Sequence, residues 1–292
     1  MTTTRHHRTW TKADGARVVE AAARALKEQY VFPERGAALA RHLRTWWAGN
    51  PDVPADIPGF CAALTARIHA HTPDLHLKVT PAPCRNADAQ HAFATAYGLQ
   101  RIEILRDNVG LIELQEFCDV QDAAPLIAAA MQIVSGTRAL VIDLRRNGGG
   151  DPHCTAFLAG FFFARVTHLS TFRTRDDAVG SQSWTPAYLP APRYLERPVV
   201  ILTSRRTGSG AEEFAYVMRH SGRARLIGEP TAGAAHPGIW VELDPLIRMF
   251  VATGCPVVAA TGSNWEGAGV EPHEAVAAEE ALERALTYLA SA

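Results

Sequence analysis

Hydrophobic residues recur at helical spacing along the first quarter of the chain. Apolar side chains at positions 18, 19, 22, 25 and 26 predict one amphipathic helix over residues 16–30, which ends before Pro33. Similar spacing predicts two more helices, over residues 35–47 and 57–71. We therefore expect an N-terminal helical cap over residues 1–72, and nothing in its sequence demands chemistry.

The pattern changes at residue 73, where short apolar runs begin to alternate with helical segments. Leu75, Leu77 and Val79 alternate with polar residues, which predicts a half-buried strand over residues 75–79. Two continuous apolar runs, 139–144 and 198–202, predict buried strands of a parallel sheet. The other expected elements are helices at 123–133, 155–163, 211–218 and 279–289, a strand at 225–228, hairpins at 101–114 and 240–252, and a polar loop at 170–197. Strand-then-helix units of this kind predict an α/β core over residues 73–292.

Composition narrows the class of protein. With 47% hydrophobic and 20% charged residues the chain can bury a core, and its net charge of −1 gives no electrostatic case for nucleic acid or an anionic membrane. The polar N-terminus has no secretory signal, and no apolar run reaches the length of a membrane helix. The five cysteines show no CxxC spacing, and no nucleotide-binding glycine motif occurs. We expect a cytoplasmic protein without metal or cofactor.

Ser209 lies at the junction of a predicted buried strand and a predicted helix. The turn before this helix is TGSG, residues 207–210, and acidic residues follow in the first helical turn. A serine there sits beside unpaired backbone N–H groups, which suits a nucleophile whose oxyanion must be stabilised. The alternative is an ordinary helix N-cap, a role that serine often has.

A run of three glycines follows the other buried strand. Gly148, Gly149 and Gly150 allow backbone N–H groups to approach a ligand closely, although a flexible turn is an alternative. Ligands in such sheets bind beyond the carboxyl ends of the strands, where both this loop and Ser209 are expected. A backbone donor loop and a serine at the same edge are compatible with acyl transfer.

A base and an acid can be sought on the remaining segments. His76 falls on the polar face of the strand predicted over 75–79, so it is a candidate base, or else a surface histidine. Lys78 shares that face, and His236 lies in a loop after the strand at 225–228. Glu266 belongs to a late loop rich in glycine. The residues alone leave these alternatives open.

Four segments resemble the tail-specific, or C-terminal-processing, serine peptidase family, and they occur in that family's order. VIDLRRNGGG, residues 141–150, resembles its DLRxNxGG segment, and TGSGAEEFA, residues 207–215, resembles its nucleophile segment. IGEPTAG, residues 227–233, resembles GExTxG, and GAGVEP, residues 267–272, resembles GxGVxPD with His273 in place of the aspartate. The resemblance implies a crotonase-like or Clp-protease-like spiral core.

Departures from the family pattern indicate a branch. Ala234 occupies the position where the processing peptidases carry a lysine base, and the space between Val79 and Gly110 is too short for a PDZ domain. DLHLK, residues 74–78, instead resembles the DxH segment of the tricorn core and of the branch similar to the interphotoreceptor retinoid-binding protein. That resemblance implies His76 as base and Glu266 as the residue that orients it. Leu75 stands where the tricorn core has a relay serine.

The resulting hypothesis is a serine peptidase that works through an acyl-enzyme. Its alternatives are a serine acyl-transfer enzyme acting on a small molecule and a non-catalytic binder of apolar ligands. We expect a peptide or small acyl substrate and, as a further option, a homo-oligomer. The implied catalytic residues are Ser209, His76 and Glu266, with the N–H groups of Gly210 and Gly149 as oxyanion donors. His236 and Lys78 compete for the base role, Gly148 is a neighbour, and Glu271 competes with Glu266. Asp143 is expected to be a structural acid, and Glu212 and Glu213 are expected to complement the helix dipole.

Overall fold

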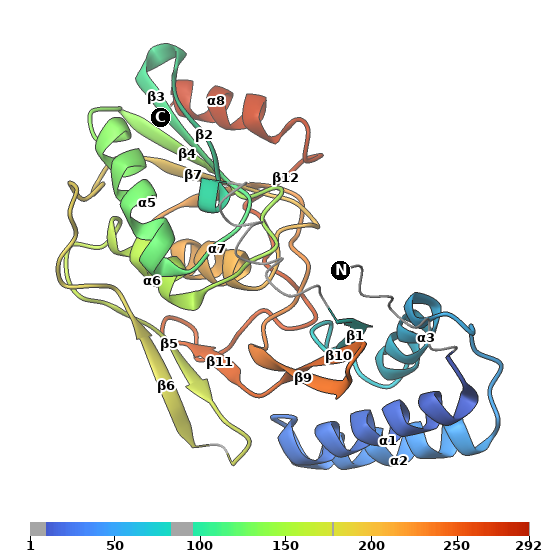
Figure 1. Ribbon diagram of the computed structural model, residues 1–292. Helices are drawn as coiled ribbons and strands as arrows, with labels where there is room; N and C mark the ends of the chain where they lie inside the picture. Colours follow the sequence, from blue (N-terminus) through green and yellow to red (C-terminus); the bar gives the residue numbers. More distant parts are fainter. Residues whose placement is uncertain (1–9, 83–95, 177, 292) are drawn as a thin grey trace, which may run out of the picture. The chain divides into compact units, whose positions relative to one another are not determined.

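The computed structural model describes residues 10–82, 96–176 and 178–291 (Figure 1). These residues form two compact units. Unit 1 contains the described residues up to 82 together with Thr174–Asp176 and Pro237–Gly254, and unit 2 contains the other described residues. The assignment of residues 1–72 as a cap and 73–292 as a catalytic core stays a prediction.

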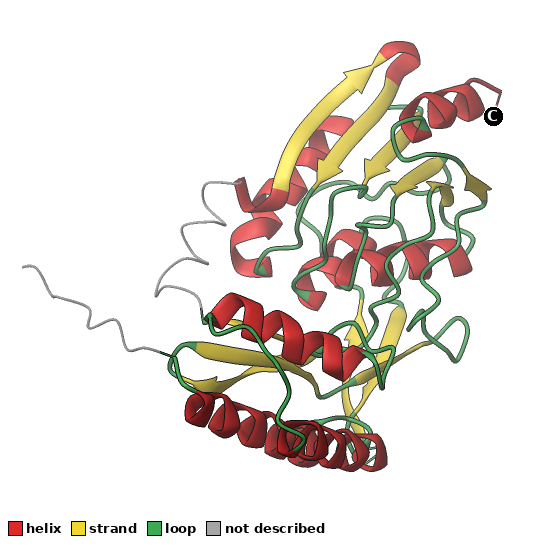
Figure 2. Ribbon diagram, turned by 90° about the vertical axis from the view of Figure 1, so that its right-hand side faces the viewer, coloured by secondary structure: helices red, strands yellow, loops and turns green. Residues whose placement is uncertain are grey.

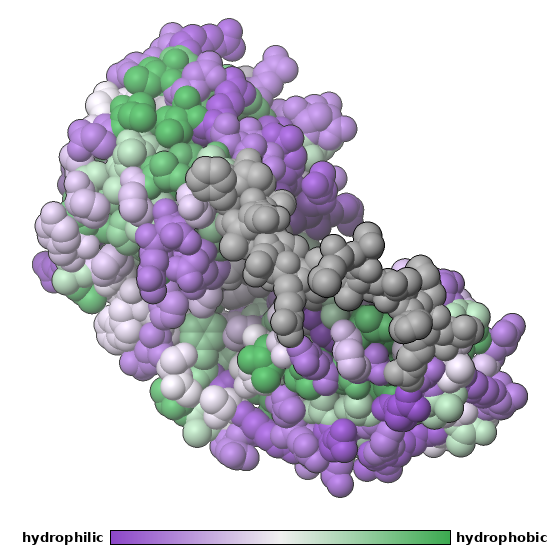
Figure 3. Space-filling model, in the orientation of Figure 1, coloured by the Kyte–Doolittle hydropathy of each residue, from purple (hydrophilic) through white to green (hydrophobic). Residues whose placement is uncertain are grey.

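Unit 1 begins with the three predicted helices, which are α1 (Lys12–Gln29), α2 (Pro33–Ala48) and α3 (Ile57–His69). Helix α1 begins with a capping box, because Thr11 and Asp14 each accept a hydrogen bond from the other's backbone N–H. Its apolar side is buried, whereas the parts of α1 and α2 visible in Figure 3 are mostly hydrophilic. The N-terminal helices are therefore confirmed.

A three-stranded antiparallel sheet completes unit 1. Its order is β1 (Lys78–Pro81), β10 (Ile247–Ala252) and β9 (Gly238–Asp244). Helix α3 packs on β1, and α1 packs on β10 and β9. Strands β1 and β10, whose paired residues are about 170 positions apart in the sequence, thus share one sheet, which local periodicity does not reveal.

Unit 2 is built on a six-stranded sheet of order β12-β8-β7-β4-β3-β2. β2 and β3 form the predicted antiparallel hairpin, and the pairs from β3 to β12 are parallel. These parallel strands and the helices between them confirm the α/β class. The bounds are β2 Leu99–Leu105, β3 Val109–Leu114, β4 Ala139–Asp143, β7 Val199–Thr203, β8 Arg225–Gly228 and β12 Glu274–Ala275.

Each face of this sheet is covered by helices, as Figures 1 and 2 show. Side chains such as Leu140, Ile142 and Ile201 point to one face and pack with helices α5, α6 and α7. Their neighbours Val141 and Val200 point to the other face and pack with helix α8. The helices are α5 Val120–Val134, α6 Pro152–Gly160, α7 Gly210–His220 and α8 Ala281–Ser291.

Two predictions of local structure are wrong. The stretch expected to be a polar loop over residues 170–197 contains β5 (His168–Arg173) and β6 (Val179–Trp184), which pair in a sheet with β11 (Cys255–Val258). The strand expected over 75–79 begins only at Lys78, and Leu75 and His76 lie in a turn. Leu77 and Val79 are buried as predicted, but Leu75 is 44% exposed, so it does not share their buried face.

Cys61, Cys118, Cys154 and Cys255 are free thiols, and Cys84 lies outside the described residues. Within residues 10–82, 96–176 and 178–291, no helix combines the length and the apolar character needed to cross a bilayer.

Helix α7 is buried around its whole circumference from Gly210 to Met218, and it carries two acids into the interior. Glu213 is 4% exposed and accepts a hydrogen bond of 2.7 Å from the hydroxyl of Ser170 on β5. Burial raises the pKa of the Glu213 carboxyl to about 7, and the bond from Ser170 only partly opposes this. Glu213 is thus a buried structural acid, as well as a first-turn residue of the helix.

We expect Glu213→Gln to stabilise the protein above neutral pH. The ordinary carboxyl pKa is 4.5 and the folded-state pKa is about 7, so the folded state binds the proton more tightly. Stability therefore falls as pH rises from 4.5 to 7, by about 3 kcal/mol in total. Glutamine has no charge to bury, so the variant should gain about 2–3 kcal/mol at pH 8.5 and nothing at pH 4.

Urea unfolding at a series of pH values measures this difference. The exposed acid Glu283 on α8 supplies the matched control, because Glu283→Gln removes a charge that is already solvated. If the free energies of unfolding of Glu213→Gln and the unmodified protein differed by the same amount at every pH, the assignment would be contradicted.

Candidate active site

Ser209 has a strained backbone at the start of helix α7. It is the N-cap residue, with φ of 51° and ψ of −121°, a region that residues other than glycine seldom occupy. Such strain persists only where surrounding contacts hold it, and it is often found at active sites. The sequence correctly placed Ser209 between strand β7 and helix α7.

The carboxylate of Glu212 holds this turn in place. Its oxygens accept hydrogen bonds from the backbone N–H of Ser209 at 2.8 Å and from the hydroxyl of Thr231 at 2.5 Å. They also accept from the N–H groups of Gly233 at 2.6 Å and Ala234 at 2.9 Å. Burial raises the pKa of the Glu212 carboxyl, while these four donors act in the opposite direction. Glu212 thereby fastens the loop after β8 to the Ser209 turn.

The glycine loop after β4 packs directly against the same turn. The N–H of Gly208 donates to the carbonyl of Asn147 at 3.0 Å, and the hydroxyl of Thr207 donates to the carbonyl of Leu144 at 2.8 Å. A Cβ atom on Gly149 would lie only 2.6 Å from the Cβ of Ser209. Only glycine allows this approach, and its φ of 105° also favours glycine.

The two backbone groups expected to bind an oxyanion differ in their surroundings. The N–H of Gly210 has no hydrogen-bond acceptor among the described residues, as expected for the first residue of a helix. The N–H of Gly149 donates to the Oδ1 atom of Asn147 at 2.8 Å. In this conformation Gly210 therefore offers a free donor, and Gly149 does not.

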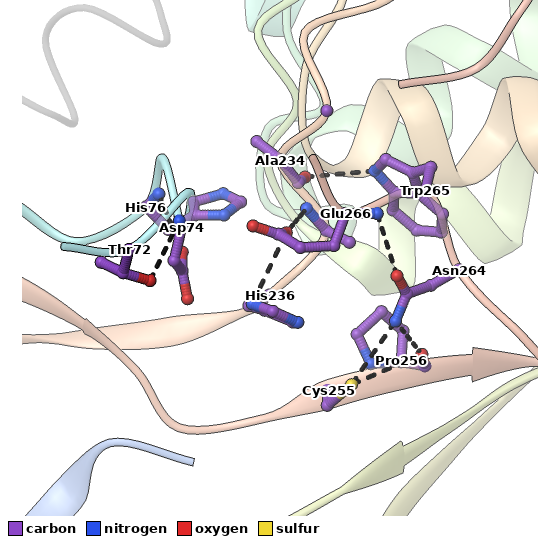
Figure 4. Close-up of polar contacts among 12 residues, drawn as sticks. Thr72, Asp74, His76, Ala234, His236, Cys255, Pro256, Asn264, Trp265 and Glu266 are labelled. Atoms are coloured by element: carbon purple, nitrogen blue, oxygen red, sulfur yellow. Dashed lines mark hydrogen bonds and ion pairs between the residues drawn. The ribbon is translucent and has the colours of Figure 1, made fainter. Parts of the chain in front are cut away.

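Glu266 lies close to His236 in unit 2, as Figure 4 shows. An oxygen of Glu266 is 3.5 Å from Nδ1 of His236 and accepts a 2.7 Å hydrogen bond from the N–H of Ala235. The indole of Trp265 donates to the carbonyl of Ala234 at 3.2 Å, which ties the late loop to the loop after β8. His236 is 4% exposed. Within unit 2 the structure thus brings Glu266 together with His236, the residue expected to compete for the base role.

His76 belongs to unit 1, in the turn that leads into β1. Its backbone N–H donates to the carboxylate of Asp74 at 3.1 Å, and the hydroxyl of Tyr30 donates to the same carboxylate at 3.0 Å. Asp74 is 2% exposed. The imidazole of His76 lies 5.5 Å from the ring of Phe250 on β10. Asp74 therefore fixes the backbone of the turn that carries His76 (Figure 4).

The remaining candidates have other surroundings. Lys78 is exposed on β1, and Gly148 is exposed in the glycine loop. Glu271 is exposed, and its backbone carbonyl accepts a hydrogen bond from Arg219. Asp143 is a structural acid as expected, because it forms a two-pronged ion pair with Arg145 at 2.5 and 2.9 Å.

Two positioning residues were missed by sequence reasoning. Asn147 shapes the glycine loop through both its side chain and its carbonyl group. Glu212 was expected only to complement the helix dipole. Its place three residues after Ser209 is the spacing of a capping box, which is the one signal that could have pointed to its contact with the Ser209 N–H.

Comparison with known proteins gives the family context. Residues 108–276, more than half of the chain, match the model of Peptidase family S41. Among solved structures, a candidate peptidase from Parabacteroides merdae has a TM-score of 0.68 and 17% identity, with 94% of this chain and 96% of that chain covered. A lipoprotein from Streptococcus agalactiae has a TM-score of 0.65 and 13% identity, with 95% and 96% covered. The photosystem II D1 C-terminal processing protease has a TM-score of 0.56 and 15% identity, with 91% and 93% covered. At these identities the likeness concerns the fold.

The contact between the glycine loop and the serine turn predicts unequal effects for two neighbouring glycines. Gly149→Ala should lower the free energy of unfolding by about 2 kcal/mol or more, through a strained φ and a clash with the Ser209 turn. Gly148→Ala is the matched control, because a Cβ there meets no atom within 4 Å. Thermal unfolding of both variants measures the difference, and equal stabilities would contradict the described packing.

Proposed function

The chain belongs to peptidase family S41, and we propose that it hydrolyses peptide bonds through an acyl-enzyme formed on Ser209. The observation that carries this assignment is the Ser209 turn. Its backbone is held at a φ of 51° by the buried Glu212 carboxylate, and its Cβ packs on the glycine loop at the carboxyl edge of the sheet. An ordinary N-cap serine needs none of this strain.

His76 is the proposed base, and Glu266 is the residue that orients it. His76 removes the proton from the Ser209 hydroxyl, whose oxygen attacks the carbonyl carbon of the scissile bond. The protonated imidazole then donates this proton to the departing amine. A water molecule, deprotonated by the same imidazole, releases the acyl group and restores the Ser209 hydroxyl. In each half of the reaction the imidazole takes one proton from the attacking oxygen and returns it to the departing atom.

His76 is proposed as the base in preference to His236 because it is the more exposed of the two histidines. His236 is 4% exposed and lies against Glu266, which suits a residue that holds the carboxylate in position. His76 is half-buried on a turn whose backbone Asp74 fixes, so the residue as a whole is more exposed than His236. The contact of 3.5 Å between Glu266 and His236 is the observation that favours the alternative assignment.

Backbone N–H groups are proposed to bind the oxyanion. The N–H of Gly210 is available for this, and removal of one such donor typically costs about 3 kcal/mol in the transition state. The N–H of Gly149 can serve if the Asn147 side chain releases it. Gly210 is therefore the main proposed donor to the oxyanion, and Gly149 is the second donor.

A single-turnover comparison of four proteins tests these roles. The unmodified chain, Ser209→Ala, His76→Ala and His236→Ala are each mixed in excess with a fluorogenic peptide panel and with an activated ester. Ser209→Ala and His76→Ala should each reduce the acylation rate by roughly 10³-fold or more. His236→Ala should cause a clearly smaller loss, because it removes a contact of Glu266 and leaves the proposed base in place.

Each outcome has a distinct meaning. Undiminished cleavage by Ser209→Ala would reject the nucleophile, and a larger loss in His236→Ala than in His76→Ala would transfer the base role. Ester turnover that depends on Ser209, without cleavage of any peptide, would favour acyl transfer on a small molecule. Thermal unfolding of every variant serves as the control for folding.

A further inference from the structure

One face of the sheet in unit 1 carries aromatic rings and cations in a row. Lys78 on β1, Phe250 on β10 and Trp240 on β9 are direct cross-strand partners. The opposite face, which includes Val79 and Met249, is buried under the helices. Lys78 and Trp240 are exposed and Phe250 is half-buried, so this row is a surface feature.

The side chains of this row contact one another. The rings of Phe250 and Trp240 meet edge to face at 5.3 Å, and the imidazole of His76 lies 5.5 Å from Phe250. The guanidinium of Arg248 lies 3.9 Å from the centre of the Trp240 ring, and the Lys78 ammonium lies 5.7 Å from it. We call these residues, His76, Lys78, Trp240, Arg248 and Phe250, the aromatic-cationic face.

The two cations lack acidic partners in the part of the chain that the structure describes. Glu242 stands opposite Arg248 in the strand register, yet no ion pair joins the two. The Nε atom of Arg248 is shielded from solvent and has no acceptor among the described residues. Arg248 and Lys78 thus carry positive charges that no carboxylate of the described residues pairs with, and an anionic ligand would supply such a partner.

We propose that the aromatic-cationic face binds an acidic segment of a peptide substrate. Side-chain carboxylates of the peptide pair with Arg248 and Lys78, and an apolar side chain between them packs on Trp240 and Phe250. The face includes His76, so a segment bound there lies beside the proposed base. This inference rests on the proposed function, which makes the substrate a peptide. It adds that the peptide carries Asp or Glu near an apolar residue.

A binding experiment on the full chain with Ser209→Ala tests the inference without turnover. Fluorescence anisotropy compares fluorescein-labelled, C-terminally amidated Gly-Glu-Phe-Glu-Gly with its Gly-Gln-Phe-Gln-Gly counterpart. The acidic peptide should bind about fivefold more tightly at low salt for each ion pair formed, and the preference should shrink as ionic strength rises.

Substitutions on the face should remove that preference. Adding Arg248→Gln and Lys78→Gln should make the two peptides bind equally, and Trp240→Ala should weaken both. Arg41→Gln, which removes an exposed arginine of α2 in the same unit, should leave the preference intact. If Arg248→Gln lowers the melting temperature, Lys78→Gln alone tests the same point, because Lys78 is exposed.

Several results would overturn the inference. One is equal affinity of the parent for both peptides, and another is a preference that survives the double substitution. A third is equal affinity for the acidic peptide and for a glutamine peptide made with a free C-terminal carboxylate, because the terminal charge alone would then account for binding. Tighter binding of a labelled twelve-residue oligothymidylate than of the acidic peptide would assign the face to nucleic acid instead. Since binding is read without cleavage, its failure is separate from a failure of Ser209 as nucleophile.

Discussion

The geometry of unit 2 around Ser209 depends on one buried carboxylate. Glu212 is fully buried and accepts four hydrogen bonds, from Ser209, Thr231, Gly233 and Ala234. A hydrogen bond to a charged group contributes roughly 1.5–3 kcal/mol, so four of them offset the cost of burying the charge. They also connect two loops that follow different strands. The backbone of the Ser209 turn is thus held by contacts that come from outside the turn.

The parallel sheet brings those loops together. β4, β7 and β8 are neighbours and run in the same direction, so the segments after them leave from one edge. The loop after β4 supplies Gly149, the loop after β7 supplies Ser209, and the loop after β8 supplies the donors for Glu212. Thr231 extends the set, because its hydroxyl also accepts from the N–H of Val270 at 2.7 Å in the loop that carries Glu266. A change in the conformation of any of these loops would therefore alter the backbone of the Ser209 turn.

Much of the fold follows from local pattern. Periodicity located the N-terminal helices, the hairpin of β2 and β3, and the buried strands β4 and β7, and it placed Ser209 between strand and helix. It missed β5 and β6 because strand β6 is largely polar and exposed. It could not place β9 and β10 beside β1, since that pairing joins distant segments. His76 falls in a turn because the Asp74 carboxylate captures its backbone N–H, a local bond that alternation of apolar residues does not report. The burial of Glu212 depends on donors that arrive from other loops.

The most direct test of the central claim is the rate of fluorophosphonate labelling at Ser209, mapped by peptide mass spectrometry, in the unmodified chain and in Glu212→Gln. Glutamine keeps the shape of the side chain but turns an N–H₂ group toward two of the four backbone and hydroxyl donors. We expect labelling at Ser209 in the unmodified chain and a rate lower by about tenfold or more in Glu212→Gln, at a temperature where near-UV circular dichroism shows both proteins folded. Equal rates in the two folded proteins, or labelling at another residue of the unmodified chain, would contradict this expectation.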